Sequence, residues 1–174
     1  MRQYFIQTKR LGFSHWENED LNLAISLWGE PEVTRYICAK GVFSIEEVQT
    51  RLMTEIANYK NYHVQYYPAF ALGSGELVGC CGFRPFDVEL GAYELGFHLR
   101  KEFWHRGFGY EAGTAAIKYG FDALRMNKLL AGHHPENIAS RALLAKLGFR
   151  YIGDNYYEPT GLYHPSYELT NRPL

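Results

Sequence analysis

The run W-H-R-G-F-G-Y-E-A-G-T-A-A-I-K-Y-G-F, residues Trp104–Phe121, decides the fold and the function that we expect of this chain. Gly107 and Gly109 can adopt backbone angles that a side chain forbids, and they let another molecule approach the main chain closely. The first N–H groups of the following helix have no partner inside it, and together with the helix dipole they form a site for phosphate. The run therefore predicts a turn that holds the pyrophosphate of a cofactor. The alternative is a glycine-rich strand-to-helix loop without a ligand.

The helix after this turn carries mostly small side chains on one face. Such side chains recur there at three- and four-residue steps, which indicates a stripe buried close against a sheet. The predicted stripe consists of Ala112, Ala115, Ala116, Tyr119 and Ala123.

A second pattern overlaps the same turn, because residues 107–112 also fit the dinucleotide fingerprint G-x-G-x-x-G/A. That fingerprint directly follows its strand, opens its domain and has an acidic residue about 20 positions later. Here the segment Arg100–Arg106 intervenes, more than half the chain comes first, and the next strand ends in Gly132-His133-His134. A P-loop is excluded because no Gly-Lys-Ser/Thr follows the glycines. A nicotinamide site is therefore disfavoured.

Length and composition predict an ordinary globular protein. The 174 residues predict a single domain, 1–174, and 47% hydrophobic with 21% charged residues is typical of soluble proteins. A net charge of −1 provides no electrostatic reason to expect nucleic acid or a membrane surface as a partner. No apolar run is long enough to span a bilayer, and residues 1–10 lack the apolar segment of a signal peptide. We therefore expect a cytoplasmic protein.

The cysteines and paired histidines do not indicate a metal. Cys38, Cys80 and Cys81 include no C-x-x-C pair. Neighbours on a strand point to opposite faces, so at most one of Cys80 and Cys81 faces any pocket; we expect buried thiols, with an acyl-carrying cysteine as the alternative. His133 and His134 lack a third ligand at a suitable spacing, so we expect a turn there.

The remaining pattern alternates helices and strands around one mostly antiparallel sheet, with a parallel strand–helix–strand crossover across the glycine turn. Ser44 and Glu47 form a capping box that predicts a helix start, and Gly148 is placed to end a helix. The segment Tyr59–Tyr67 has no clear pattern. We expect a mixed α+β domain. The expected strands are Arg10–Trp16, Pro68–Leu72, Leu77–Phe83, Tyr93–Leu99, Lys128–Ala131, Tyr151–Tyr157 and Tyr163–Leu169, with a first helix from Asn18 that Gly29 and Pro31 stop, and a last helix Ile138–Leu147.

Three segments between Tyr93 and Gly153 resemble one known family. They are E-L-G-F-H-L at Glu94–Leu99, W-H-R-G-F-G-Y-E-A at Trp104–Ala112, and P-E-N-I-A-S-R-A-L-L-A-K-L-G-F at Pro135–Phe149. In this order and spacing they resemble the GNAT superfamily of acetyl-CoA-dependent N-acetyltransferases, above all the branch of ribosomal-protein N-terminal acetyltransferases. The resemblance implies a sheet splayed between two central strands, Tyr93–Leu99 and Lys128–Ala131, with helices on both faces.

The resemblance also implies where acetyl-CoA binds. Main-chain groups near Phe97 and Leu99 would pair with its pantetheine arm, Asn137 would contact that arm, and Ser140 would lie near the thiol. Trp104 stands where the superfamily often has Gln or Arg, so a side-chain contact from that position is not carried over. Among the basic residues of the segment 100–106, we assign phosphate contact to Arg106 only. The pyrophosphate would meet backbone N–H groups of Arg106, Gly107, Phe108, Gly109 and Tyr110.

Two residues are candidates for the chemistry. Glu94 is the candidate general base, directly or through water; its alternative is a solvent-facing carboxylate paired with His98. Ser140 is the candidate acid toward the leaving thiolate, because the tyrosine that many relatives have four residues later is Leu144 here and cannot donate. Its alternative is a helix serine bonded to a nearby carbonyl. Asn137 is also a good N-cap, and the cap oxygen leaves its amide donors available.

The sequence thus predicts an acetyl-CoA:amine N-acetyltransferase that acts in a ternary complex, needs no metal and, by resemblance, forms a homodimer. The acceptor is a protein or peptide N-terminus or a small-molecule amine. A weak base suits an α-amino group, with pKa about 7.7–8, better than a lysine side chain at about 10.4. A catalytically silent acyl-CoA-binding module or sensor is the alternative, and it needs neither Glu94 nor Ser140. Side chains that line either the acceptor groove or the core are Tyr156, Tyr157, Tyr163 and Tyr167.

Overall fold

One eight-stranded sheet organises residues 2–171, the part of the chain that the structure, a computed structural model, describes. The strands are β1 (Ile6–Gln7), β2 (Leu11–Phe13), β3 (Tyr66–Ala71), β4 (Leu77–Asp87), β5 (Ala92–Leu99), β6 (Lys128–Gly132), β7 (Arg150–Tyr157) and β8 (Leu162–Thr170). The α-helices are α1 (Leu21–Trp28), α2 (Pro31–Thr34), α3 (Ile45–Tyr62), α4 (Phe108–Asp122) and α5 (Ile138–Lys146).

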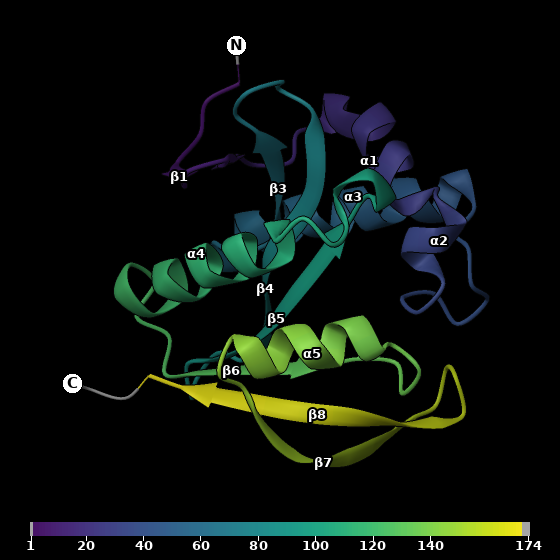
Figure 1. Cartoon of the computed structure of the whole chain (residues 1–174), viewed down its shortest axis with the longest axis vertical. Helices are drawn as coiled ribbons and strands as arrows, with labels where there is room; N and C mark the ends of the chain where they lie inside the picture. Colours follow the sequence, from purple (N-terminus) through teal and green to yellow (C-terminus); the bar gives the residue numbers. More distant parts are fainter. Residues whose placement is uncertain (1, 172–174) are drawn as a thin grey trace.

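The strand order is β1-β2-β3-β4-β5-β6-β8-β7, and every neighbouring pair is antiparallel except β5 and β6 (Figure 1). The parallel pair is connected through α4. The predicted α+β class, with one parallel crossover in a mostly antiparallel sheet, is therefore confirmed.

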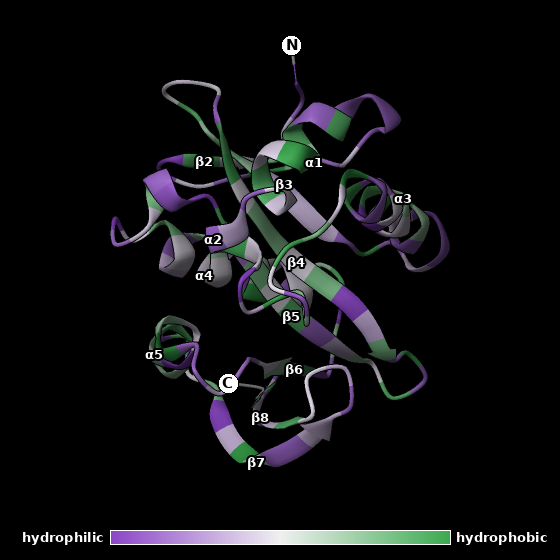
Figure 2. Cartoon of the chain, turned by 90° about the vertical axis from the view of Figure 1, so that its right-hand side faces the viewer, coloured by the Kyte–Doolittle hydropathy of each residue, from purple (hydrophilic) through white to green (hydrophobic). Residues whose placement is uncertain are grey.

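Helices cover both faces of this sheet, and each face has its own buried cluster (Figures 1 and 2). On one face α1, α2 and α3 bury Leu27, Val33 and Leu52, respectively. On the other face α4 and α5 bury Ala112 and Leu144. Fully burying a large apolar side chain such as Leu stabilises a fold by roughly 1.5–3 kcal/mol. Within the described residues, no helix is long and apolar enough to cross a bilayer.

The buried face of α4 differs from the predicted stripe. Ala112 and Ala116 are buried as expected, but Ala115 and Tyr119 are only half-buried and Ala123 is exposed. The prediction considered only residues with side chains and left the glycines out. It therefore assigned the buried stripe to a neighbouring face of the helix. The residues that complete the buried face are Gly109, Gly113 and Gly120.

Two of these glycines determine how closely α4 approaches its neighbours. A Cβ atom at Gly120 would lie 2.8 Å from Cζ of Phe83 on β4, and one at Gly113 would lie 2.7 Å from Cδ1 of Leu147, which follows α5. Both distances are shorter than side-chain contacts normally allow. Residues without side chains in the middle and near the end of α4 therefore let this helix lie close to α5 and to the sheet.

Several element boundaries differ from the expected ones. The first helix ends before Gly29 and Pro31, as expected, but Pro31 also begins the short helix α2, where the N–H that proline lacks would have no partner inside the helix. The unpatterned segment Tyr59–Tyr67 contains the end of α3 and the start of β3, and β4 continues to Asp87 beyond its expected end. The first expected strand, Arg10–Trp16, is shortened to β2.

The predicted capping box at the start of α3 is present. Ser44 Oγ accepts a hydrogen bond from Glu47 N at 3.2 Å, and Glu47 Oε2 accepts one from Ser44 N at 2.8 Å. We expect Ser44→Ala to lower the free energy of unfolding by about 1 kcal/mol, because the Glu47 N–H in the first turn loses the side-chain oxygen that accepts its hydrogen bond. Urea denaturation measures this difference. Ser44→Asp, which retains a cap oxygen, is the control; equal losses in both variants would contradict the capping role.

Candidate active site

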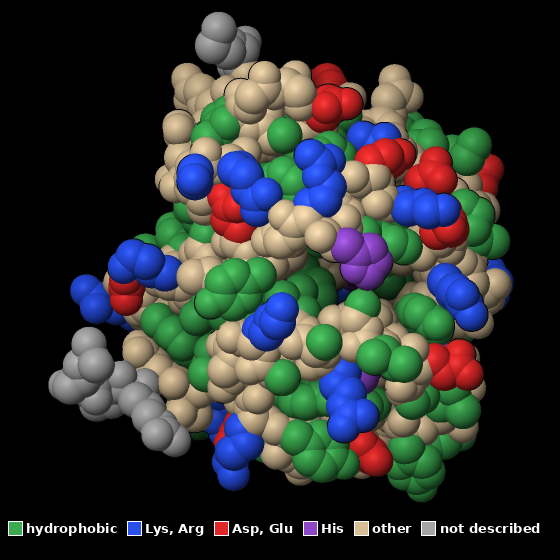
Figure 3. All heavy atoms as spheres, viewed as in Figure 1, with side chains coloured by type: hydrophobic (Ala, Val, Ile, Leu, Met, Phe, Trp, Pro, Cys, Tyr) green, Lys and Arg blue, Asp and Glu red, His purple; other side chains and the backbone are tan. Residues whose placement is uncertain are grey.

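The parallel pairing of β5 with β6 ends early and opens a gap in the sheet. Ala92, Tyr93 and Glu94 pair with residues 128–130 of β6. Beyond Glu94 the described residues show no further pair between the two strands, although β6 continues beside β8 as far as Gly132. Figure 1 shows the two strands diverging, and the surface in Figure 3 is hollowed between α4 and α5. The implied splay between the central strands is therefore present.

The turn before α4 lies at this gap and presents unpaired main-chain donors. Gly107 is the helix N-cap and has φ 79°, a left-handed conformation that favours glycine. None of the N–H groups from Arg106 to Tyr110 donates a hydrogen bond to any described residue; the first to do so is Glu111, to the Gly107 carbonyl. Successive unpaired N–H groups at a helix start suit an anion such as a pyrophosphate. The residues present therefore fit the group that the sequence predicts.

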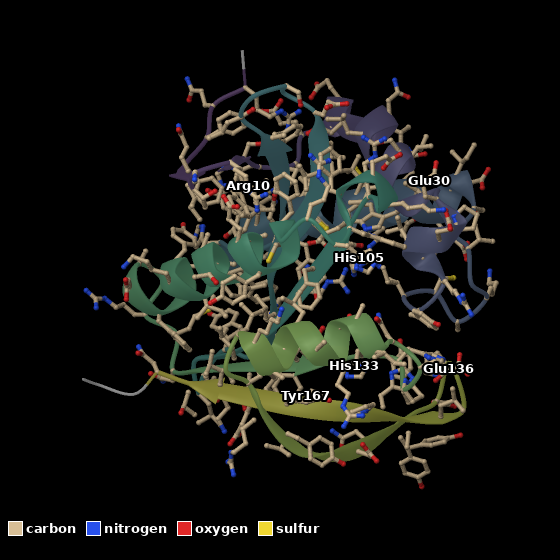
Figure 4. All side chains as sticks on the ribbon, in the orientation of Figure 1. Arg10, Glu30, His105, His133, Glu136 and Tyr167 are labelled. Atoms are coloured by element: carbon tan, nitrogen blue, oxygen red, sulfur yellow. The ribbon has the colours of Figure 1, made fainter. Side chains whose placement is uncertain are left out.

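A residue far away in sequence holds this turn in place. Arg10 Nη1 donates to the carbonyl of Arg106 at 3.0 Å, and its Nε donates to Glu111 Oε2 at 2.6 Å. The guanidinium of Arg10, which is labelled in Figure 4, also lies 4.1 Å from the ring centroid of Phe108. Thr8 Oγ1 donates to Glu111 Oε1 at 2.6 Å. Partial burial acts to raise the pKa of Glu111, but the hydrogen bonds from Thr8 and Arg10 hold it below its usual value. We call Arg10, Glu111 and Thr8 the turn clamp.

Trp104, at the position where the superfamily often has Gln or Arg, bonds the protein's own main chain. Its Nε1 donates to the carbonyl of Leu99 at 2.8 Å, which joins the end of β5 to the turn. One main-chain group near the predicted pantetheine position is therefore already bonded. Of the basic residues, Lys101 pairs with Glu32 at 2.6 Å, while Arg106 is exposed and lies over the rings of Phe103 and Phe108.

The N-terminus of α5 supplies the second wall of the gap. Asn137 is its N-cap, and Asn137 Oδ1 accepts a hydrogen bond from Ser140 N at 3.1 Å. The Asn137 amide and the Ser140 hydroxyl make no hydrogen bond to residues 2–171, so the carbonyl bond suggested as the alternative for Ser140 is absent there. Leu144 is 1% exposed and packs in the core below α4.

The two faces of β5 carry different residue types. Leu95 is buried, and Phe97 and Leu99 pack against the cluster under α4 and α5. On the opposite face, half-buried Glu94 accepts a hydrogen bond from Tyr66 Oη at 3.0 Å. The suggested Glu94–His98 pair was wrong, because the hydroxyl that reaches Glu94 comes from β3.

His98 is engaged elsewhere. Its Nδ1 lies 3.1 Å from Trp28 Nε1, which donates to it, and its ring packs edge-on against Tyr66. Burial, together with the positive charges of Arg51 and Arg84, lowers the pKa of His98 well below its usual value. His98 is therefore neutral at physiological pH and places no positive charge beside Glu94.

Cys80 and Cys81 are buried, and His133 and His134 pack against tyrosines. Cys80 and Cys81 are fully buried on opposite sides of β4, and burial raises the pKa of Cys81 to about 12 and also raises that of Cys80. Neither thiol is poised to carry an acyl group. His133 lies 3.2 Å from Tyr167 Oη, and His134 stacks on Tyr36 at 5.1 Å between ring centroids. Among residues 2–171, no three His, Cys, Asp or Glu side chains are grouped to hold a metal ion.

The tyrosines of the closing hairpin divide into two kinds. Tyr167 is 7% exposed and belongs to the core under α5, stacked on His133. Tyr156, Tyr157 and Tyr163 are exposed on β7 and β8. Only the surface tyrosines are therefore accessible to an acceptor molecule.

Sequence reasoning missed the turn clamp and Tyr66. Arg10 and Glu111 are 101 residues apart, and Tyr66 and Glu94 belong to strands separated by β4. The sequence contains only a weak signal for the turn clamp, because Thr8 and Arg10 come just before a strand. It contains none for Tyr66, which lies in the segment without a clear pattern.

Comparisons with known proteins agree with this geometry. A family model described as an acetyltransferase (GNAT) domain matches residues 10–150. The uncharacterised N-acetyltransferase p20 of Bacillus licheniformis is 33% identical over 150 residues, which cover 85% of this chain and 83% of that protein. The ribosomal protein uS5-alanine N-acetyltransferase of Escherichia coli (strain K12) is 31% identical over 91 residues, 51% of this chain and 46% of that protein.

Solved structures show the same fold. An acetyltransferase of the GNAT family from Bacillus anthracis has a TM-score of 0.81 at 24% identity, covering 95% of this chain and 97% of that one. A ribosomal L7/L12 alpha-N-protein acetyltransferase in complex with coenzyme A has a TM-score of 0.82 at 15% identity, covering 97% and 98%. Because the matched family model spans most of the chain and the predicted splay and turn are present, this protein belongs to the GNAT acetyltransferases.

Proposed function

We propose that this protein transfers the acetyl group of acetyl-CoA directly to a primary amine in a ternary complex. The observation that carries the proposal is the row of unpaired N–H groups from Arg106 to Tyr110 at the mouth of the gap beyond Glu94. A pyrophosphate needs such donors, and beyond Glu94 the gap leaves the main chain of β5 without a strand partner on the β6 side. A relative of the same fold has been solved with coenzyme A, which supports the choice of cofactor.

The proposal gives each residue of the site a role. The turn Arg106–Tyr110 holds the pyrophosphate. Main-chain groups of Phe97 and Leu99, other than the Leu99 carbonyl that Trp104 already bonds, pair with the pantetheine arm. The Asn137 amide contacts the same arm, because its oxygen is used by the cap and its N–H₂ group is not. The N–H near Phe97 serves the oxyanion, a contribution of roughly 3 kcal/mol in characterised acyl transfer.

The chemistry needs proton transfers at two atoms. Glu94, directly or through a water, takes a proton from the acceptor ammonium and passes it to solvent. The neutral amine nitrogen then forms a bond to the thioester carbon, and the carbon–sulfur bond breaks. The nitrogen of the new amide then loses its extra proton, and the hydroxyl of Ser140 delivers a proton to the thiolate of coenzyme A. The products are an N-acetyl amine, coenzyme A as its thiol, and one released proton.

We propose an α-amino group, as at a protein or peptide N-terminus, as the acceptor. A lone carboxylate is a weak base, and an α-amino group with pKa about 7.7–8 needs less help than lysine at about 10.4. The Escherichia coli relative, a ribosomal protein uS5-alanine N-acetyltransferase, supports the same class of acceptor. Other small-molecule amines of low pKa are the competing acceptors.

The decisive test measures thiol release from acetyl-CoA across a panel of amines that includes N-terminal peptides and lysine derivatives. We expect release with α-amines, and Glu94→Gln should lower kcat by about 10²-fold or more with unchanged calorimetric binding of acetyl-CoA. An enzyme-only blank subtracts the protein's own cysteines. Cofactor binding without any release would favour the silent acyl-CoA-binding module, and unchanged turnover in Glu94→Gln would remove that residue from the mechanism.

Asn137→Asp separates the capping role from the ligand role. An aspartate keeps an oxygen that can accept from Ser140 N, but it has no amide N–H₂ group. We therefore expect the melting temperature to stay near that of the wild type while the Kd for acetyl-CoA rises roughly tenfold. Isothermal calorimetry and thermal melts measure the two quantities. Wild-type affinity in this variant would show that Asn137 is only a cap.

Arg10→Met tests whether the turn clamp supports cofactor binding. Loss of the bond to the Arg106 carbonyl frees the turn, so we expect the KM for acetyl-CoA to rise about tenfold with little change in kcat. Lys9→Met is the matched control, because it removes an exposed positive charge beside Arg10 without touching the clamp. Similar KM increases in both variants would show that the loss of a positive charge, and not the loss of the bond to the turn, weakens the binding of acetyl-CoA.

A further inference from the structure

The Tyr66 side chain extends from β3 across β4 to reach β5. Tyr66 pairs with Gly82 on β4, and Gly82 pairs with Gly96 on β5. A Cβ atom at Gly96 would lie 2.2 Å from Cζ of Tyr66 and 2.3 Å from its hydroxyl oxygen. The ring therefore occupies the space that a side chain at Gly96 would fill. From there its hydroxyl donates to Glu94 Oε1 at 3.0 Å.

The main chain of Tyr66 is fixed on both sides. Its N–H donates to Oε2 of the fully buried Glu55 at 2.8 Å, and its carbonyl accepts from Trp16 Nε1 at 2.7 Å. The Arg84 guanidinium lies 4.5 Å from the ring centroid, and Tyr66 is only 3% exposed. A ring enclosed in this way has one position available, so its hydroxyl is a fixed donor.

Arg84, the nearest arginine, is committed to a different carboxylate. Arg84 Nη2 bonds Glu55 Oε1 at 2.7 Å, and Glu94 forms no ion pair among the described residues. Burial and the nearby charge of Glu94 raise the pKa of Tyr66 well above its usual value, so the phenol keeps its proton. Arg84 lies opposite Glu94 in the register of β4 and β5, and the two charges interact, but the two side chains form no ion pair among the described residues. The hydroxyl of Tyr66 is therefore the group that holds the Glu94 carboxylate by a hydrogen bond.

Glu94 has one oxygen engaged and one available. Oε1 accepts from Tyr66, and no hydrogen bond to Oε2 comes from residues 2–171. Glu94 is also the last residue of β5 that pairs with β6, so its carboxylate lies where the gap begins. A carboxylate tethered through one oxygen at this point can direct its second oxygen to an amine or a water.

We propose that Tyr66 is a positioning residue for the reaction: its hydroxyl holds the Glu94 carboxylate in the orientation in which Oε2 receives the acceptor's proton. The proposal rests on the proposed function, in which Glu94 is the general base. Gly96 belongs to the same arrangement, since only a glycine there leaves room for the Tyr66 ring.

Tyr66→Phe removes the hydroxyl and keeps the ring. We expect kcat with an α-amine to fall roughly tenfold, because the base loses a charge-assisted hydrogen bond, while the KM for acetyl-CoA stays unchanged. Tyr67→Phe is the matched control: that hydroxyl donates to the His63 carbonyl at 3.1 Å, away from Glu94, and its loss should leave kcat at the wild-type value.

A double-mutant cycle distinguishes positioning from a separate role. If Tyr66 acts through Glu94, then Tyr66→Phe will cause no further loss of kcat in a Glu94→Gln background. Additive losses, or full kcat in Tyr66→Phe, would overturn the proposal. An active wild type with full turnover in Glu94→Gln would also overturn it, together with the proposed base. A wild type that releases no thiol with any amine would instead reject the proposed function itself.

Discussion

Beyond Glu94, the main chain of β5 has no strand beside it on the β6 side, and this interruption determines the rest of the arrangement. Unpaired N–H and C=O groups inside a protein need a partner, so such a gap is stable only when something polar fills it. The strands on either side are each held from outside, β5 by β4 and β6 by β8. The sheet can therefore divide in its middle without losing its order.

Side chains alternate between the two faces of β5, and this alternation separates cofactor binding from base chemistry in the proposed mechanism. Leu95, Phe97 and Leu99 face α4 and α5, where the cofactor is proposed to lie. Glu94 faces Tyr66 and the α1–α3 side, where an acceptor would arrive. The proposed mechanism thus assigns cofactor binding and base chemistry to opposite faces of one strand, at the point where that strand leaves its neighbour.

Features encoded over three or four residues could be predicted from the sequence. The capping box of Ser44 and Glu47, the Asn137 cap and the glycine turn before α4 all depend on neighbours along the chain, and each is present. Contacts between distant segments could not be predicted. The Tyr66–Glu94 bond depends on the register of three strands, and the turn clamp joins residues 101 positions apart. The splay itself came only from the family resemblance.

The N–H groups of the turn Arg106–Tyr110, where the pyrophosphate is proposed to bind, belong to the main chain, and this affects how the site tolerates mutation. Exchanging the side chains of Arg106 or Tyr110, both exposed, leaves the same N–H groups in place. The donors depend instead on the left-handed backbone at Gly107 and on Arg10, which bonds the turn from 96 positions away. Substitutions of the exposed side chains of this turn therefore spare its donors, whereas a substitution at Gly107, or at Arg10 far away in the sequence, would displace them.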